Sequence, residues 1–165
     1  MALKRTYCLL NILLCCIACL AGCSAKTYTP VLQTSFDLNA LVKTGDFSYQ
    51  ARLVRDESGV SVTPLTTAAA GMKIACDGKS ITLSQGAFSK SIEKGKLDAT
   101  NPAAVLYEVF SYLESLEKVN SYFKDDCFII RGKTSVGTFI LVQTKNNKMK
   151  SVSVPDAKIE IEFIT

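Results

Sequence analysis

Cysteine is the residue type in this chain with the greatest capacity for chemistry, because histidine is absent. The sequence holds seven cysteines and no histidine. Without an imidazole, Ser-His-Asp and Cys-His catalysis are excluded, as are the commonest zinc sites. The cysteines fall into an N-terminal group, a boundary residue and a C-terminal pair: Cys8, Cys15, Cys16 and Cys19, then Cys23, then Cys76 and Cys127.

Two glycine-lysine motifs resemble the end of a phosphate-binding P-loop. They are Gly78-Lys79-Ser80 and Gly132-Lys133-Thr134. A P-loop needs a further glycine five positions before the first of these residues, and Lys73 and Cys127 occupy those positions. Adjacent carboxylates such as Asp56-Glu57 lie in predicted turns, where solvation is the favoured interpretation. We therefore expect a protein that is not an enzyme.

Cys23 follows a segment with the layout of a secretory signal. Lys4 and Arg5 precede the mostly apolar residues 7–21, and small residues come next. This run is shorter than the ~20 apolar residues that a membrane-spanning helix needs. A cluster of charges that would stop transfer is also missing after it. The segment is therefore better interpreted as a cleaved signal than as a transmembrane anchor.

Leu20-Ala21-Gly22-Cys23 resembles the lipobox of bacterial lipoprotein precursors. The resemblance implies that diacylglycerol is attached to the Cys23 sulfur and that cleavage between Gly22 and Cys23 leaves Cys23 first in the mature chain. Each buried methylene contributes ~0.8 kcal/mol, so two or three acyl chains hold a protein durably on a membrane. We expect a lipid-anchored protein at the cell membrane, facing outside the cytoplasm. The sequence does not distinguish an inner from an outer membrane.

Cys76 and Cys127 are then the only thiols left in the mature chain. Outside the cytoplasm they can form one disulfide. The alternative, which we favour, is two independent buried cysteines. The net charge of +4 for the whole chain is too mild to indicate a nucleic-acid partner. No metal or cofactor is expected, and the oligomeric state is left open.

A period of two in the apolar residues predicts antiparallel strands. Residues 36–43 and 46–53 each carry an apolar side chain at every second position, as strands with one buried face do. A turn at Thr44-Gly45 would place Val42 opposite Phe47 and would bring four apolar pairs onto one face. The first two strands therefore form a hairpin.

Two further hairpins follow from turn signals at Asp77-Gly78 and Asn146-Asn147. They place Ile74 opposite Ile81 and Leu141 opposite Val152. Other short strands are predicted at 60–62, 88–92, 127–130, 139–142 and 159–163.

One helix interrupts the strands. Asn101 is a good N-cap, Pro102 suits the first helical position, and apolar residues recur at helical spacing from Val105 to Leu116. The strands at 127–130 and 139–142, with Phe128 opposite Leu141, are apolar on both faces, so each side of the sheet there needs a cover. The helix supplies one cover, and the second is a strand, a loop or a ligand.

The order of motifs over residues 35–165 resembles small lipoproteins of clostridia-type Gram-positive bacteria. In layout it is similar to the LolA/LolB superfamily of lipoprotein carriers. The motifs are Phe36-Asp37, Gly45-Asp46-Phe47, the segment from Cys76 to Leu83, the proline-led helix, Ile130-Arg131-Gly132-Lys133, the segment from Gly137 to Leu141, and Ser153-Val154-Pro155.

This resemblance implies an α+β fold, in which a strongly curved antiparallel sheet forms a half-barrel with one main helix packed on it. Residues 1–22 would be the signal peptide, 23–34 a tether and 35–165 the half-barrel domain. The apolar concave face would bind a lipid or an acyl chain, and the residues expected to line it are Phe36, Leu38, Phe47, Val105, Val109 and Phe110. Candidates for the carriers' cavity arginine are Arg52, Arg55 and Arg131, and the sequence does not choose among them. The alternative is a structural or interaction lipoprotein of the cell envelope without a small-molecule ligand.

Overall fold

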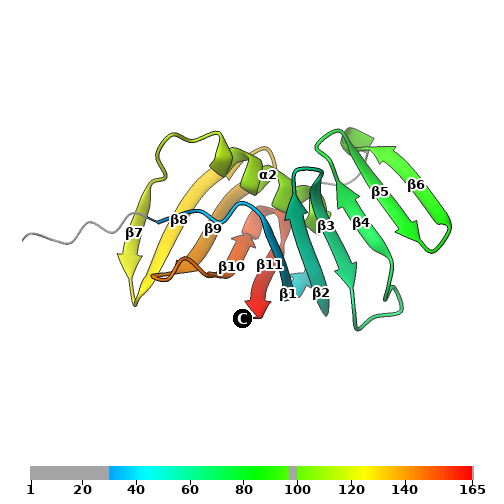
Figure 1. Ribbon diagram of the computed structural model, residues 1–165, viewed down its shortest axis with the longest axis horizontal. Coiled ribbons are helices and arrows are strands. Elements are labelled where there is room, and N and C mark those ends of the chain that lie inside the picture. Colours follow the sequence, from blue (N-terminus) through cyan, green and yellow to red (C-terminus); the bar gives the residue numbers. More distant parts are fainter. Residues whose placement is uncertain (1–29, 97–99, 165) are drawn as a thin grey trace, which may run out of the picture.

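A computed structural model describes residues 30–96 and 100–164, so the predicted signal peptide and Cys23 lie outside the described residues. The described residues form one open antiparallel sheet of eleven strands and one α-helix (Figure 1). The predicted α+β class with a curved antiparallel sheet agrees with this architecture. None of the helices in this part of the chain is long and apolar enough to cross a membrane.

The helix is α2 (Pro102–Glu114), and two short 3₁₀ turns are η1 (Lys94–Lys96) and η2 (Pro155–Ala157). The strands are β1 (Phe36–Thr44), β2 (Phe47–Asp56), β3 (Gly59–Pro64), β4 (Lys73–Cys76), β5 (Ser80–Gln85), β6 (Phe88–Glu93), β7 (Ser121–Lys124), β8 (Cys127–Thr134), β9 (Gly137–Thr144), β10 (Met149–Val154) and β11 (Ile159–Ile164).

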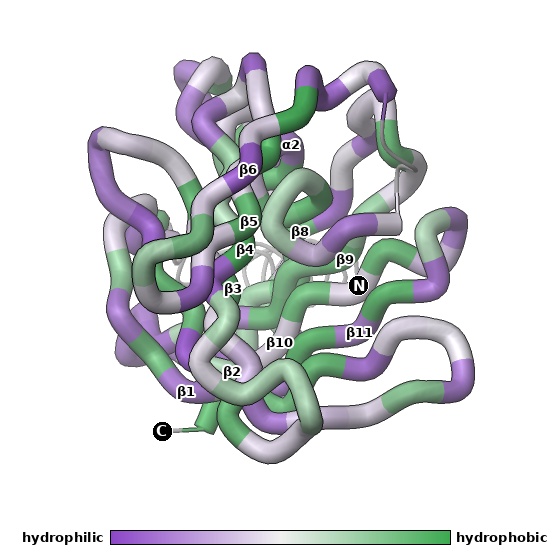
Figure 2. The backbone as a smooth tube through the Cα atoms, turned by 90° about the vertical axis from the view of Figure 1, so that its right-hand side faces the viewer, coloured by the Kyte–Doolittle hydropathy of each residue, from purple (hydrophilic) through white to green (hydrophobic). Residues whose placement is uncertain are grey.

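The sheet consists of two meanders joined at its centre. Strands β1 to β6 follow one another on one side, and β7 to β11 follow one another on the other. The two halves meet where β1 pairs with β11, with Val42 opposite Ile161. Figure 2 shows hydrophilic residues gathered at the turns and hydrophobic residues along the strands between them.

The register of the first hairpin is shifted by two residues from the predicted register. Val42 lies opposite Tyr49 instead of Phe47, and the turn is at Gly45-Asp46. Gly45 has a φ of +58°, and a two-residue type II′ turn requires positive φ at its first central position, where glycine is favoured. The predicted turn would have placed Thr44 at that position. The shift therefore follows from the turn chemistry.

The observed register differs from the predicted one by the same two residues in two other strand pairs. Ile74 lies opposite Leu83 instead of Ile81, and Leu141 lies opposite Ile130 instead of Phe128. The predicted pair of Leu141 with Val152 is confirmed. Since side chains alternate with a period of two, a shift of two changes the partners and leaves every residue on its predicted face.

Helix α2 lies across the concave face. Its predicted start is confirmed, because the Asn101 side chain accepts hydrogen bonds from the backbone N–H groups of Ala103 and Ala104. It contacts β3, β4 and β8. Two glycines allow its close approach, since an added Cβ at Gly78 would meet the Tyr107 ring and one at Gly132 would meet the rings of Tyr112 and Phe139.

Residues 30–35, which we call the strap, cover the same face of the sheet as α2, whereas Ile129, Ile140 and Val142 on the opposite face are half-buried. The Gln143 Nε2 atom donates to the Val31 carbonyl oxygen at 2.7 Å, and an Arg55 nitrogen donates to the Thr34 carbonyl oxygen. Leu32 packs against the core. The end of the predicted tether therefore belongs to the folded domain. Its small, polar composition did not reveal this, because its partners are distant in sequence.

Candidate functional site

Most residues predicted to line an apolar cavity lie in a packed core. Val105, Val109 and Phe110 are fully buried, and the Phe36 ring lies 5.1 Å from the Phe110 ring between centroids. Leu38 is half-buried and packs against the same cluster. A cavity able to hold an acyl chain would leave accessible area on its walls, and Val105 and Val109 have none. Beneath α2 the concave face is therefore filled by side chains.

Phe47 is a correction to the predicted lining. Its side chain is 78% exposed. Phe47 is the first residue of β2 and directly follows the Gly45-Asp46 turn. By the alternation along β2 its side chain belongs to the concave face, but Phe47 lies at the tip of the hairpin, beyond the part of the sheet that α2 covers.

Cys76 and Cys127 are both free and buried. They belong to β4 and β8, which are separated by six strands in the sheet. A disulfide needs Cα atoms within roughly 7 Å of each other, so a bridge between these two is excluded. The disulfide expectation is wrong, and two independent buried cysteines are what the fold contains.

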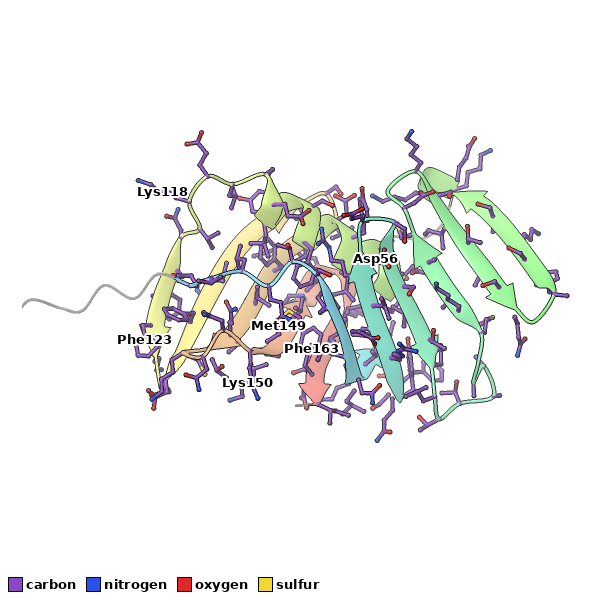
Figure 3. The ribbon with its side chains drawn as sticks, in the orientation of Figure 1. Asp56, Lys118, Phe123, Met149, Lys150 and Phe163 are labelled. Atoms are coloured by element: carbon purple, nitrogen blue, oxygen red, sulfur yellow. The ribbon has the colours of Figure 1, made fainter. Side chains whose placement is uncertain are left out.

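One accessible recess of the described domain is a polar groove of about 700 Å³ beside α2. Three parts of the chain form it: Thr34 and Ser35 of the strap, residues 55–59 at the β2–β3 turn, and one side of α2. Figure 3 shows Asp56 near the middle of the row of strands. The residues of α2 that line the groove are Tyr107, Ser111 and Glu114.

Arg55 holds these three parts together. Its Nη1 and Nη2 atoms donate to the two carboxylate oxygens of Glu114, at 2.9 and 2.6 Å. Nη1 also donates to the Thr34 carbonyl oxygen, and the guanidinium lies 5.4 Å from the centroid of the Phe110 ring. Arg55 is only 8% exposed. One buried side chain therefore links strand β2, the strap and the C-terminal turn of α2.

Of the three arginines that the sequence left open, only Arg55 occupies the concave face. Arg52 pairs with Asp37 on the outer face, and Arg131 lies over the exposed ring of Tyr122. Arg55 has the parity of Ala51 and Leu53, the buried residues before it in β2. The alternation noted in the sequence, followed two residues further, would have placed it inside.

The groove is acidic. The hydrogen bonds from Arg55, opposed by partial burial, hold the pKa of Glu114 below its ordinary value. Hydrogen bonds from the Ser58 hydroxyl and backbone N–H lower the pKa of Asp56 in the same way. Both carboxylates are ionised at neutral pH. Together with Glu57, the groove carries three carboxylates against the single guanidinium of Arg55.

This arrangement favours binding over proton transfer. A carboxylate with a lowered pKa is a weak general base, and the Ser58 hydroxyl has no imidazole to activate it. Groups of three or more cysteines, aspartates or glutamates arranged to hold a metal ion do not occur among the described residues. The groove can instead offer hydrogen-bond acceptors and negative charge to a cationic ligand.

Comparison with known proteins does not assign the chain to a family. No family model matches the chain, and no curated protein matches it. Function has therefore to be argued from the fold and the groove.

Proposed function

We propose that the protein is a lipoprotein, anchored through diacylglycerol on Cys23 to the outer side of the cell membrane, and that its domain binds another protein of the cell envelope without catalysing a reaction. The signal layout and Leu20-Ala21-Gly22-Cys23 support the anchor. The open, curved sheet is compatible with the resemblance to the LolA/LolB superfamily. That resemblance supports the architecture more than it supports a particular cargo.

The observation that carries the binding proposal is the contrast between a packed interior and an accessible polar groove. Val105 and Val109 leave no space beneath α2. The groove beside α2 is open and is walled by a preformed set of charged and hydroxyl side chains. Because Arg55 fixes the strap and Glu114 in place, little order has to be gained when a ligand enters.

The charge of the groove indicates the chemistry of its partner. Asp56 and Glu57 lie on the β2–β3 turn, and the Arg55 guanidinium is already paired with Glu114. The unpaired negative charge favours lysine or arginine side chains of a partner protein. Such complementarity raises the association rate and selects partners more than it adds affinity.

A second candidate function is lipid or acyl-chain binding on the concave face. Its support is the apolar character of that face and the family resemblance. Leu32 of the strap and the apolar side of α2 now cover that face. Acyl-chain binding in this fold therefore requires the strap to leave.

Three measurements on protein purified from its native membrane test the proposal. The intact mass should include diacylglycerol on Cys23 and should show that residues 1–22 have been removed. Native mass spectrometry should show a domain without bound lipid. A photo-crosslinking residue at Ser58, on the rim of the groove, should capture a protein that the same residue at the exposed Ser89 of β6 does not.

Charge variants sharpen the crosslinking result. Asp56→Asn with Glu57→Gln should abolish the Ser58 adduct, and the adduct should weaken as salt rises. Lipid bound in equal amount to protein, with no adduct specific to Ser58, would support the second candidate. A mature chain whose intact mass lacks diacylglycerol on Cys23 would overturn the anchor.

A further inference from the structure

The end of the sheet at β7 exposes apolar and basic side chains together. Val31 of the strap is 65% exposed and Phe123 of β7 is 41% exposed. Tyr122, beside Phe123, is also exposed on the outer face. We call this region the β7 end, and its exposed lysines are Lys124, Lys145, Lys148 and Lys150.

The parts of the β7 end are tied to one another. The Val31 N–H donates to Asn147 Oδ1 at 3.2 Å, which joins the start of the strap to the β9–β10 turn. The Lys145 N–H donates to the Asp126 carbonyl oxygen at 3.0 Å, which joins that turn to the β7–β8 turn. Figures 1 and 3 show these segments at one end of the sheet, with Phe123 and Lys150 both toward the lower left. The region is therefore one continuous surface.

The described chain also begins at this end. Pro30 follows Cys23 by seven positions, and a fully extended chain spans at most about 3.6 Å per residue, so the two are at most about 25 Å apart. Since Val31 is bound to the β9–β10 turn, an anchor on Cys23 would hold the β7 end, rather than the distant β6 end, next to the membrane.

The chemistry of the surface matches an anionic membrane. Four lysines stand against the two aspartates of the β7–β8 turn, Asp125 and Asp126, and Lys150 also lines a recess with Glu160 and Glu162. The Lys145 ammonium is 3.2 Å from Asp126, which leaves Lys124 and Lys148 as exposed lysines outside this ion pair. Aromatic rings beside lysines are typical of surfaces that lie at the headgroup level of a bilayer.

We propose that the β7 end docks on anionic phospholipid as a second, non-covalent membrane contact. The inference rests on the proposed anchor at Cys23, which brings this end to the bilayer. Docking would fix the orientation of the domain, with the Phe123 ring at the interface and β6 directed away from the membrane.

The absence of tryptophan from the chain gives a clean test. Phe123→Trp places a single tryptophan at the β7 end, and Phe88→Trp places one on β6, where Phe88 is exposed. Val31→Trp is a second probe at the β7 end, because only the backbone of Val31 is bonded to the domain. The lipidated full-length mature protein is reconstituted into vesicles of phosphatidylcholine, with or without phosphatidylglycerol, that contain a brominated lipid as quencher.

Docking predicts strong quenching at positions 123 and 31 in vesicles with phosphatidylglycerol and little quenching at position 88. Lys124→Gln with Lys148→Gln should lower the docked-to-free ratio at least about tenfold, because each lysine near an anionic surface contributes on the order of fivefold. Lys90→Gln with Lys96→Gln, on the β6 side, is the matched control and should change nothing. High salt should release the β7 end while the anchor stays bound.

Equal quenching at positions 123 and 88, or quenching at 123 that is the same without phosphatidylglycerol, would overturn the docking proposal. The intact mass of the same preparation reports the anchor separately. A chain that carries diacylglycerol but shows no selective quenching refutes docking alone, whereas a chain without diacylglycerol refutes the proposed function.

Discussion

Removing Glu114 is expected to destabilise the domain more than removing Arg55, although Arg55 makes more contacts. The reason is where the surviving charge is left. The Arg55 side chain is 9% exposed and the Glu114 side chain is 45% exposed. A lone Glu114 carboxylate can be solvated by water. A lone Arg55 guanidinium keeps only the Thr34 carbonyl and the Phe110 ring.

The magnitudes follow from these two situations. Stranding a buried charge costs about 3–5 kcal/mol, and the remaining Thr34 and Phe110 contacts place Glu114→Ala near the lower bound, at about 3 kcal/mol. Arg55→Met loses charge-assisted hydrogen bonds worth about 1.5–3 kcal/mol but keeps an apolar side chain against Phe110, so about 1.5 kcal/mol is expected. The double variant should be about as stable as Arg55→Met alone, because no stranded charge remains.

Urea unfolding followed by far-ultraviolet circular dichroism measures the free energy of unfolding of the native chain, the two single variants and the double variant. Equal slopes of unfolding free energy against urea would show that only stability has changed. Arg55→Met costing as much as Glu114→Ala, or costs that simply add in the double variant, would refute the reasoning. Lys43→Met is a suitable control, because its partners Glu160 and Glu162 are exposed, solvent screens both pairs, and their loss should change the stability little.

Three more outcomes are expected. The Arg55 hydrogen bonds hold the pKa of Glu114 below its ordinary 4.5, so the pair's contribution is present at neutral pH and is lost as pH falls below about 4.5. The thermal midpoint of the native chain should then fall more steeply in acid than that of the Arg55→Met, Glu114→Ala variant, and parallel curves would contradict this. Gly132→Ala would force its Cβ against the rings of Phe139 and Tyr112 and should cost about 1–3 kcal/mol in urea titrations; Gly95→Ala meets nothing and should stay within about 0.5 kcal/mol. Burial raises the pKa of the Cys76 thiol, and both Cys76 and Cys127 should resist alkylation until urea unfolds the chain; a disulfide-linked peptide in an unreduced digest would contradict that result.

The sequence predicted which face each strand buries better than it predicted which residues pair. Val42, Ile74 and Leu141 all lie on their predicted face, yet the partners predicted for Val42 and Ile74, and one of the two predicted for Leu141, differ from the observed ones by two positions. Face assignment depends on alternation, which a shift of two preserves, whereas the pairing depends on the conformation of one or two turn residues. Gly45 was recognised as a turn residue, but its place within the turn was not.

Arg55 and the strap show a second limit of prediction from sequence. Arg55 lies just beyond the alternating apolar residues predicted for β2, which end at Leu53. It lies opposite Phe36 in β1, and its burial depends on Thr34 and Glu114, which come from other parts of the chain. Strand β7 was missed because its four residues are too few to show a period. Contacts between distant segments leave no local pattern.

The pairing of the first strand with the last has a consequence for how the domain is completed during folding. All the other pairings in the sheet join strands that are consecutive in the chain, so both meanders can form before the chain is complete. The seam of β1 with β11 joins residues more than a hundred positions apart, and closing so long a loop is slow. Until Ile159–Ile164 has joined the sheet, β1 and β10 each present an unpaired edge. A chain arrested before Ile159 would thus consist of two separate half-sheets with exposed edges. Strand β11, Ile159–Ile164, is the element that joins them into one sheet.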